Sequence, residues 1–380
     1  MSGSSKGAPP LEGVTVVALE QAVAAPIATC RLADAGARVI KVERPGVGDF
    51  ARGYDKAANG VSSYFGWANR GKESIALDLR DGADAKVMST LIDGADVFIQ
   101  NLAVGATGRL GLDAATLMAR RPELVVCDLS GYGPEGPYAN MKAYDLLVQA
   151  ESGLLSVSGA PGPLGRIGVS VVDIATGTNA ALAITTALLR KVVTGEGAHI
   201  TTSLFQTMAE WMTVPLMHHD YLGAAPERVG LAHPSIAPYG GFETADGIVV
   251  LISVQADREW IALCELVLEA PELATDARFM TNHDRVERRS ETDGHVASVF
   301  RSMPSDELMT RLTDARIAHA VVSDVARLSD HPQLRRVEIV HELGSFELPA
   351  PPFTADWEAF GPVPALDEHG PAIRSEFGIN

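Results

Sequence analysis

The stretch GVTVVALEQAVAAPIATCRLADAGARVIKVE, residues 13–43, decides the fold class. Two apolar runs rich in β-branched residues, 13–20 and 37–43, flank an Ala-rich segment at 25–36. This pattern predicts a strand, a helix and a second strand. Because such a β-α-β connection is right-handed and places its strands parallel, the stretch predicts the start of a parallel α/β sheet.

The same alternation continues for another ninety or so residues. Strands are expected at 74–79, 96–101 and 124–133, with helices between them at 83–93 and 113–120. Strands and helices that alternate in this way predict a Rossmann-like, doubly wound parallel sheet, whose ligands bind at the carboxyl ends of the strands. The loop after the first strand reads LEQAVAAP and not GxGxxG, so it gives no support for a nicotinamide cofactor.

The composition of the chain changes near residue 218, where a stretch rich in Pro and Gly precedes an apolar run at 248–254. We therefore predict a large domain and a smaller α+β domain. The expected divisions are a flexible tail over 1–10, the large domain over 11–217, the small domain over 218–325 and a segment over 326–380 that returns to the large domain.

Composition limits the partners and the location of the protein. A formal net charge of −17 on 380 residues argues against nucleic acid or an anionic membrane as a partner. The start, MSGSSKGAPP, is not a signal peptide, and no apolar run is expected to approach the length of a membrane span. The isolated cysteines Cys30, Cys127 and Cys264 are expected to be reduced core thiols. These features predict a cytoplasmic protein.

An anionic ligand would need a local group of cations in so acidic a chain. Several basic residues fall at or near the predicted strand ends of the large domain, and together they could hold a polyphosphate. They are Arg44, Arg70, Lys72, Arg80, Arg109 and Lys142.

A single carboxylate, Asp173, stands between a strand-like run at 168–172 and a long apolar helix expected at 174–191. Its position favours a role as helix N-cap, and the helix dipole would hold it ionised and ready to react. Walker and HExxH motifs are missing from the sequence, and no GxSxG nucleophile elbow follows a predicted strand. The adjacent His218 and His219 lack the spacing of a metal pair. No metal is expected.

Several blocks, in this order along the chain, resemble the class III CoA-transferases, the formyl-CoA and carnitine CoA-transferase (CaiB/BaiF) family. They are PLEGVTVVALEQAVAAPIATCRLADAGARVIKVERPGVGDFAR, NRGKESIALDL, ADVFIQNLAVGATGRLG, SGYGPEGPY and YDLLVQAESG. The resemblance implies that Asp173 is the nucleophile and that the chain forms an interlocked homodimer. It also implies CoA-binding positions at Ala22, Val23, Ala24, Arg44, Leu77, Arg80, Asn101, Leu102, Arg109 and Lys142.

The family's reaction moves CoA between carboxylic acids through an aspartyl anhydride and an aspartyl-CoA thioester, with no permanently bound cofactor and acyl-CoA as co-substrate. The blocks are most similar to the branch that acts on mesaconyl-, succinyl-, citramalyl- or itaconyl-CoA. A cation would be needed to bind the second carboxylate of such a substrate, and the candidates are Arg166, Arg228 and His233. Tyr144 and Asp145 are expected to shape the pocket, and Gly240 and Gly241 resemble the family's mobile glycine loop at 236–242.

Two other functions stay open from the sequence. Racemases of 2-methylacyl-CoA share the fold and carry a histidine in the motif GHD, where this chain reads AYD with Tyr144. Tyrosine, with a pKa near ~10, is a poor proton-transfer base at neutral pH. A non-catalytic acyl-CoA-binding protein would follow if Asp173 were only a helix cap.

Overall fold

The computed structural model describes residues 7–378 and divides the chain into two compact units. The first unit comprises the chain up to Leu154, Ile167–Thr213 and the chain from Arg335. The second comprises Leu155–Arg166 and Val214–Leu334. Compared with the predicted divisions, the loop 155–166 moves to the smaller unit, which also extends further at both ends. Residues 1–6 of the predicted tail lie outside the described residues.

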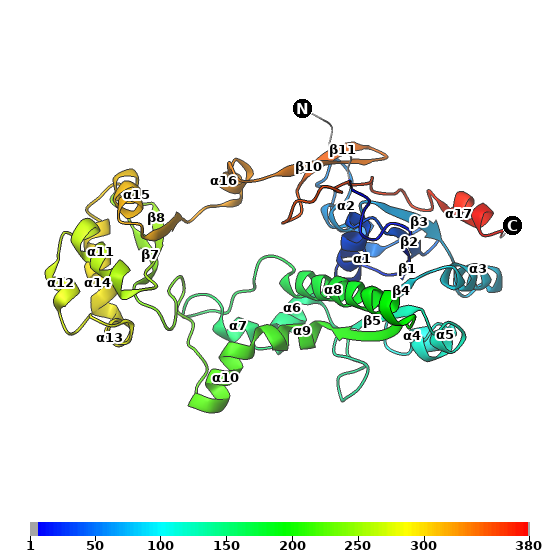
Figure 1. Ribbon diagram of the computed structural model, residues 1–380, viewed down its shortest axis with the longest axis horizontal. Coiled ribbons are helices and arrows are strands. Elements are labelled where there is room, and N and C mark those ends of the chain that lie inside the picture. The colour runs from blue at the N-terminus through cyan, green and yellow to red at the C-terminus, as the bar shows by residue number, and fades with distance from the viewer. Residues whose placement is uncertain (1–6, 379–380) are drawn as a thin grey trace. The chain divides into compact units, whose positions relative to one another are not determined.

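The first unit is built on a six-stranded parallel sheet (Figure 1). Its strands are β1 (Thr15–Leu19), β2 (Arg38–Glu43), β3 (Lys72–Ala76), β4 (Val97–Gln100), β5 (Val125–Ser130) and β6 (Ala198–Ser203). The spatial order β3-β2-β1-β4-β5-β6 reverses direction between β1 and β4, the point at which doubly wound sheets bind ligands. The predicted α/β class and parallel sheet are confirmed.

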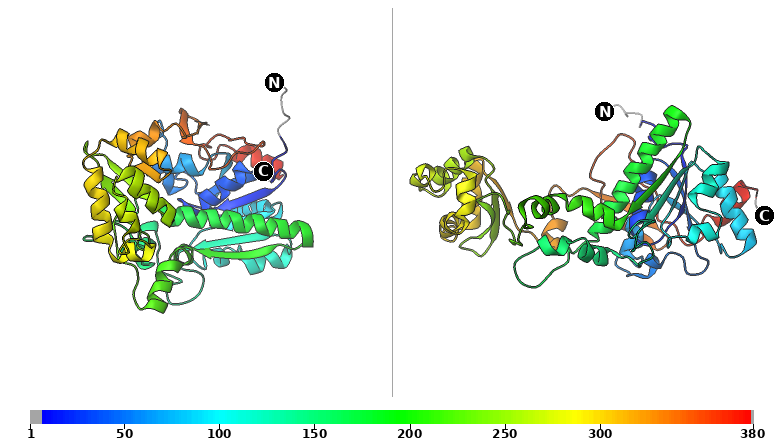
Figure 2. Two further views of the ribbon diagram at one scale, coloured as in Figure 1. Left: turned by 60° about the vertical axis from the view of Figure 1, so that its left-hand side comes forward. Right: turned by 90° about the horizontal axis from the view of Figure 1, so that it is seen from below.

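Helices cover both faces of this sheet (Figure 2). Because successive strand residues point to opposite faces, Val16 and Ala18 pack in one core while Val17 and Leu19 pack in the other. The first core is covered by α1 (Ala24–Asp34), α8 (Val171–Thr194) and α9 (Leu204–Trp211). The second is covered by α3 (Gly82–Asp93), α5 (Ala114–Arg120) and α17 (Gly370–Glu376).

Shorter elements complete the first unit. They are η1 (Phe50–Gly53), α2 (Ser63–Ala68), α4 (Ala106–Arg109), α6 (Asp145–Glu151) and the antiparallel hairpin β10 (Arg336–His341) and β11 (Gly344–Pro349). Helix α7 (Leu154–Val157) spans the division between the units. The strand expected at 74–79 begins at Lys72 instead, because the buried Lys72 ammonium is paired with Glu20 and can therefore lie inside the sheet.

The long helix α8 packs directly on α1. At their contact Gly177 is essential, since a Cβ at this position would lie 2.4 Å from the carbonyl oxygen of Ala24. Helix α8 is long and apolar enough to cross a membrane, contrary to the expectation that no such run exists. Half of its most apolar window is buried inside the protein, which is the behaviour of a core helix.

The second unit contains a three-stranded antiparallel sheet in the order β7-β8-β9, with its own core around Trp260 and Phe300. The strands are β7 (Tyr239–Glu243), β8 (Val249–Ser253) and β9 (Ala318–Val321). The helices are α10 (Thr213–Leu222), which begins at the last residue of the first unit, α11 (Asp257–Ala262), η2 (Leu263–Val267), α12 (Glu272–Thr275), α13 (Asn282–Glu287), α14 (Arg289–Phe300), α15 (Ser305–Asp314) and α16 (Val325–Ser329).

Candidate functional site

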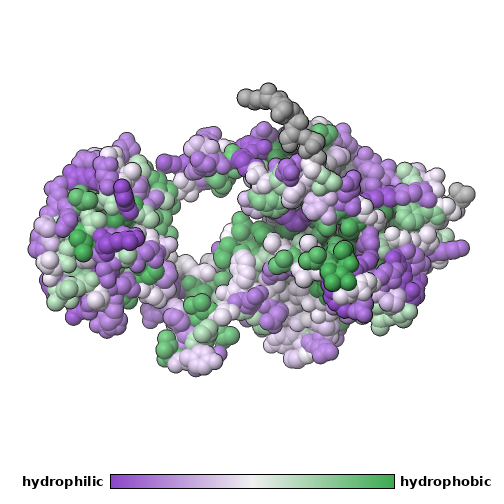
Figure 3. Space-filling model, in the orientation of Figure 1, coloured by the Kyte–Doolittle hydropathy of each residue, from purple (hydrophilic) through white to green (hydrophobic). Residues whose placement is uncertain are grey.

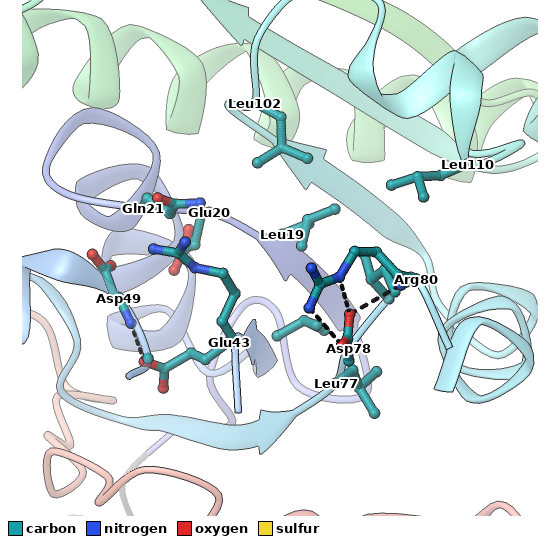
Figure 4. Close-up of a pocket in the computed structure, with 14 residues that line it drawn as sticks. Leu19, Glu20, Gln21, Glu43, Asp49, Leu77, Asp78, Arg80, Leu102 and Leu110 are labelled. Atoms are coloured by element: carbon teal, nitrogen blue, oxygen red, sulfur yellow. Dashed lines mark hydrogen bonds and ion pairs between the residues drawn. The ribbon is translucent and has the colours of Figure 1, made fainter. Parts of the chain in front are cut away.

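A pocket of about 240 Å³ lies at the carboxyl ends of β1, β2, β3 and β4 (Figure 4). Leucines make its apolar walls, and charged side chains line it from the strand ends. The leucines are Leu19, Leu77, Leu79, Leu102 and Leu110, and the charged residues are Glu20, Glu43, Arg44, Asp49, Asp78 and Arg80. An apolar slot with cations at its edge suits a ligand that joins an aromatic ring to phosphates.

A buried network of charges underlies this pocket. The side chains of Glu20, Lys41 and Lys72 are fully buried, and Glu20 accepts hydrogen bonds from Lys72 at 2.7 Å, from Thr29 at 2.8 Å and from Lys41 at 3.4 Å. Burial alone would raise the pKa of Glu20, but the two ammonium groups hold it below its usual value. The pKa of Lys41 is raised, because Glu20 and Asp49 outweigh the effect of burial. Both groups are therefore charged at neutral pH.

A second buried acid, Glu43 at the end of β2, is neutralised in the same way. Its carboxylate pairs with Arg52 at 2.7 Å and accepts a hydrogen bond from the Ser74 hydroxyl at 2.7 Å. Burial would raise its pKa, yet these partners lower it to about 2. The acids beside the pocket are thus fixed structural anions.

The loop between β1 and α1 is held from two sides at the switch point. The Asn101 side chain accepts a hydrogen bond from the Gln21 amide and donates one to the Gln21 carbonyl, both at 2.9 Å. On the other side the Ala22 amide donates to both carboxylate oxygens of Asp49, at 3.0 and 3.1 Å. Ala22 has a φ of 64°, a left-handed conformation that is uncommon for alanine.

Asp173 lies in the first turn of α8, which begins at Val171. The expectation that it is the N-cap is wrong, because the N-cap residue is Ser170, which makes no side-chain cap, and Asp145 at the start of α6 supplies the acceptor for the helix amides. The Asp145 carboxylate accepts hydrogen bonds from the amides of Val172 at 2.8 Å and Asp173 at 3.3 Å. Gln149 donates to the other Asp145 oxygen at 2.7 Å and also binds the backbone of Ile167. The strand-like run at 168–172 is therefore not a strand: residues 168–170 are a loop, and residues 171–172 are the first residues of α8.

The Asp173 carboxyl group differs electrostatically from the other acids. Burial, together with the nearby Asp145 carboxylate, raises the pKa of Asp173 to about 7. None of the described residues donates a hydrogen bond or supplies a cation to its side chain. The expectation that the helix terminus keeps Asp173 fully ionised is therefore corrected, since desolvation and like-charge repulsion outweigh the dipole.

The positions predicted to bind CoA divide into three groups. Arg44, Leu77, Arg80 and Leu102 line the pocket, and Arg80 forms a bidentate ion pair with Asp78 at 2.8–2.9 Å. Ala22, Val23, Ala24 and Asn101 form or hold the adjacent loop, and Ile174 of α8 packs against the small core of Val23, Ile27 and Ala68. Arg109 and Lys142 are exposed outside the pocket lining.

Two members of the predicted basic rim are not at the carboxyl ends of the strands. Arg70 is buried in an ion pair with Asp34, and Lys72 lies at the start of β3. Both are structural cations, because each neutralises a buried acid. Sequence reasoning missed Lys41, Asp49 and Gln149. A lysine inside the apolar run RVIKVE was the one available sign that an acid must lie buried nearby.

The predicted acyl-pocket residues fall in both units. Tyr144, which is 61% exposed, and the buried Asp145 belong to the first unit. Arg166, Arg228, His233, Gly240 and Gly241 belong to the second. Arg228 donates to the carbonyls of Gly162 and Pro163, and His233 stacks on Tyr239 with ring centroids 5.2 Å apart.

The expected glycine loop at 236–242 is wrong from Tyr239 onward, because these glycines lie inside β7 and pair with β8. The cysteines were expected to be core thiols, and all three are free and buried. Among residues 7–378, no group of histidine, cysteine, aspartate and glutamate could hold a metal ion.

Comparisons with known proteins agree on one family. The sequence model of CoA-transferase family III matches residues 11–370. An acetyl-CoA:oxalate CoA-transferase of Acetobacter aceti is 36% identical over 97% of this chain and 96% of its own length. A succinate–glutarate CoA-transferase of Agrobacterium fabrum is 34% identical over 89% of this chain and 87% of its own. The crystal structure of a CAIB/BAIF family protein from Brucella suis superimposes with a TM-score of 0.83 at 33% identity, covering 97% of this chain and 99% of that one.

The electrostatics of Asp173 predict that Asp173→Asn stabilises the protein in a pH-dependent way. Because the pKa of Asp173 is higher in the folded chain than in the unfolded chain, its ionisation opposes folding increasingly as the pH rises from about 4 to about 7. The variant should raise the thermal unfolding midpoint by a few degrees at pH 8, and the gain should vanish below pH ~4. Differential scanning calorimetry across this range measures the effect.

The matched control is Asp145→Asn, the same chemical change on the neighbouring acid. Asp145 accepts hydrogen bonds from two helix amides and from Gln149, so its neutralisation should lower the midpoint at pH 8. A lower midpoint for Asp173→Asn at pH 8 would contradict our interpretation of Asp173 as a buried acid without a compensating partner.

Proposed function

Because the chain belongs to CoA-transferase family III, as its sequence resemblance predicted, we propose that it transfers CoA between small dicarboxylic acids with Asp173 as nucleophile. The observation that supports this proposal is the environment of Asp173. Its half-buried carboxyl group lies in the first turn of α8, close to the loop between β1 and α1. Among the described residues, no cation and no hydrogen-bond donor is engaged at its oxygens. A carboxylate that is partly shielded from water and has no hydrogen-bond donor is a stronger nucleophile than a fully solvated one.

The proposed reaction conserves the thioester bond. An Asp173 oxygen attacks the thioester carbonyl of the donor, CoA leaves as thiolate, and a mixed anhydride forms. The thiolate then attacks the aspartyl carbonyl, which releases the donor carboxylate and leaves an aspartyl-CoA thioester. The acceptor carboxylate displaces the thiolate to form a second anhydride, and attack of the thiolate on the acceptor carbonyl returns Asp173 as carboxylate. No water, reductant or metal takes part in this balance.

Each attack creates an oxyanion, which backbone amides can stabilise when water is excluded. The amides of Val23 and Ala24 at the start of α1 are the proposed source, because the Ala22 amide already donates to Asp49. Ile174, which follows Asp173, packs against the small core that contains Val23. For the nucleotide part of CoA we propose the pocket of Figure 4, where Leu77 and Leu102 offer apolar walls and Arg44 and Arg80 offer cations. Asn101, Arg109 and Lys142 complete the proposed CoA contacts.

The proposed substrates are dicarboxylic acyl groups such as succinyl, mesaconyl, citramalyl or itaconyl. Oxalate, succinate and glutarate, the acids in the names of two similar proteins, each carry two carboxyl groups. We propose Arg166 and His233 as the cations for the second carboxylate. The Arg228 guanidinium is engaged by two backbone carbonyls, so we assign it a role in holding the loop 155–166.

One observation favours racemisation of 2-methylacyl-CoA as the second candidate. An acid whose pKa is near 7 also suits proton transfer at neutral pH, and Asp173 has this property. Racemisation needs a second base on the other face of the substrate, and Tyr144 stands where the racemases carry a histidine. Transfer remains the better-supported function, because it needs Asp173 alone. A non-catalytic acyl-CoA-binding protein is the third candidate.

We further propose a cytoplasmic location, with acyl-CoA and a carboxylic acid as the small-molecule partners. The buried free thiols and the net charge of −17 support this proposal and argue against nucleic acid or an anionic membrane as a partner.

The covalent mechanism predicts an adduct on Asp173. Wild-type protein incubated with succinyl-CoA or mesaconyl-CoA and trapped with hydroxylamine should gain mass on the peptide that contains Asp173, whereas Asp173→Asn should gain none. Trapping should accelerate as the pH rises toward about 7, because the nucleophile is the ionised form. Intact-mass and peptide mass spectrometry measure both effects. Exchange of the α-proton in deuterated water without an adduct would establish racemase chemistry. If neither the adduct nor the exchange is found, a binding protein is the remaining function.

Selection of dicarboxylates predicts a specific effect of the proposed cations. Arg166→Ala and His233→Ala should each lower the ratio of kcat/KM for succinate to that for butyrate as acceptor by about tenfold, since a charge-assisted hydrogen bond is lost. The control is Arg278→Ala, an exposed arginine of the same unit that pairs with Asp276. An unchanged ratio in both variants would show that the second carboxylate is bound elsewhere.

A homodimer is proposed from exposed apolar surface on two helices. On α8 the side chains of Leu182, Leu189, Val192 and Val193 are between 65% and 83% exposed, beside a groove of about 1170 Å³ bordered by β6 and α9. Helix α10 has no buried residue, although it carries Val214, Leu216 and Met217. Figure 3 shows hydrophobic surface over both helices. Apolar area of this extent is typical of a surface that a partner covers.

The dimer predicts a defined response to charge on α8. The double variant Leu182→Glu, Val193→Glu should convert a particle of twice the chain mass to one of single mass, because two carboxylates cannot be buried without partners. Size-exclusion chromatography with light scattering measures this change. Leu266→Glu, at an isolated exposed leucine of the second unit, should leave the mass unchanged. A monomeric wild-type protein would refute the proposal.

A further inference from the structure

The strongest unexplained feature outside the proposed chemistry is Asp49, an acid that is only 2% exposed. Its carboxylate receives four hydrogen bonds: two contacts from the Ala22 amide, one from the Lys41 ammonium at 2.9 Å and one from the Ala51 amide at 2.9 Å. Its own amide donates to Glu43 at 2.9 Å. Asp49 is therefore fixed by the ends of β1 and β2 and by the start of η1.

The residue that Asp49 holds, Ala22, is in a conformation that it would not choose by itself. A φ of 64° brings the alanine Cβ close to the following carbonyl group, so only external contacts keep the residue there. The amide of Ala22 donates to the Asp49 carboxylate, and the Gln21 backbone is bonded to Asn101, so the peptide group between Gln21 and Ala22 is held from both sides.

The position of Ala22 determines where the start of α1 lies. The preceding residue, Gln21, is held by Asn101, and the following Val23 is the N-cap of α1 without any side-chain cap. Downstream, the carbonyl of Ala24 is in close contact with Gly177 of α8. A change of backbone at Ala22 would thus move the loop relative to both the pocket at the strand ends and the first turns of α8.

We propose that Asp49, neutralised by Lys41, is a positioning residue for the CoA thioester: it holds Ala22 in the left-handed conformation that aims the loop between β1 and α1 at the substrate. This inference rests on the proposed function, because the loop acts on CoA only if CoA binds there. Asp49 itself touches neither the ligand nor the reacting atoms in this proposal.

A negative charge is needed at this position for two reasons. Two of the three groups that meet the Asp49 side chain are backbone amides and the third is an ammonium, so every neighbour donates and none accepts. An asparagine would turn an NH₂ group toward one of these donors, and Lys41 would keep only Glu20, at 3.4 Å, as a partner. Asp49→Asn should therefore release Ala22.

The experiment compares free-CoA binding and steady-state kinetics in wild type, Asp49→Asn and Ala22→Val. Valine is strongly disfavoured in the left-handed region, so Ala22→Val releases the loop and leaves the buried charges intact, which covers the case in which Asp49→Asn does not fold. Both variants should raise the calorimetric Kd for CoA by about tenfold while the KM for the acceptor carboxylate stays within about twofold. A merely structural role would lower stability without this separation.

Rescue and control variants sharpen the test. Adding Ala22→Gly to Asp49→Asn should recover about threefold of the lost CoA affinity, since glycine enters the left-handed region without strain. The matched control, Asp55→Asn, changes an acid of the same segment that also receives two backbone amides, from Ala57 and Ser63, but does not contact the loop. Its CoA affinity should equal that of wild type.

The possible results of this experiment distinguish a failure of the positioning role of Asp49 from a failure of the proposed function. Wild type that neither binds CoA nor transfers it would refute the proposed function, and this inference with it. Wild type that binds and transfers CoA while Asp49→Asn and Ala22→Val keep wild-type affinity would refute the positioning role alone. Loss of affinity in Asp55→Asn equal to that in Asp49→Asn would also refute it, because the effect would then belong to the segment and not to Asp49.

Discussion

The ion pair between Lys41 and Asp49, with both side chains removed from water, is the interaction on which the rest of the first unit depends. It joins the middle of a central strand to the loop that follows the neighbouring strand. A buried ion pair contributes little net stability, because desolvation costs about as much as the pairing returns. Its value is geometric: each donor and acceptor is satisfied in one arrangement only, so the backbone at the switch point between β1 and β4 is fixed.

Local patterns were sufficient to predict the sheet because most of its strands are continuous apolar runs in the sequence. Runs such as VTVVAL and VFIQ are apolar on both faces, as buried parallel strands are, and short turns separate them from helices. The start of β3 was missed for the opposite reason. A strand that opens with Lys72 reads as polar until its partner Glu20, fifty-two residues earlier, is known to lie beside it. The loop 155–166 likewise joins the second unit through contacts such as Arg228 with Pro163, which no local pattern records.

The candidate site shows the same division. Asp173 could be found, because a lone acid at the start of an apolar helix is visible in the sequence and the family resemblance assigns it a role. Its environment could not be found. The acid that caps α8 is Asp145, twenty-eight residues earlier, and the side chain that steadies it, Gln149, lies a turn further along α6. Whether a carboxylate caps a helix or stays without partners depends on which donors form hydrogen bonds to its oxygens, and these donors are set by the tertiary structure.

The buried acids of the first unit differ from Asp173 in their hydrogen-bond partners, and this difference supports the role proposed for Asp173. Glu20, Glu43 and Asp49 are buried with cations and amides directed at their oxygens, so their negative charge is already stabilised and has little tendency to attack. Asp145 accepts hydrogen bonds from two amides at the start of α8 and one from Gln149. Burial and the nearby Asp145 carboxylate raise the pKa of Asp173 to about 7, and among residues 7–378 none donates a hydrogen bond to its side chain, which costs stability at neutral pH. In the proposed mechanism, a covalent bond to an acyl group removes this unfavourable charge.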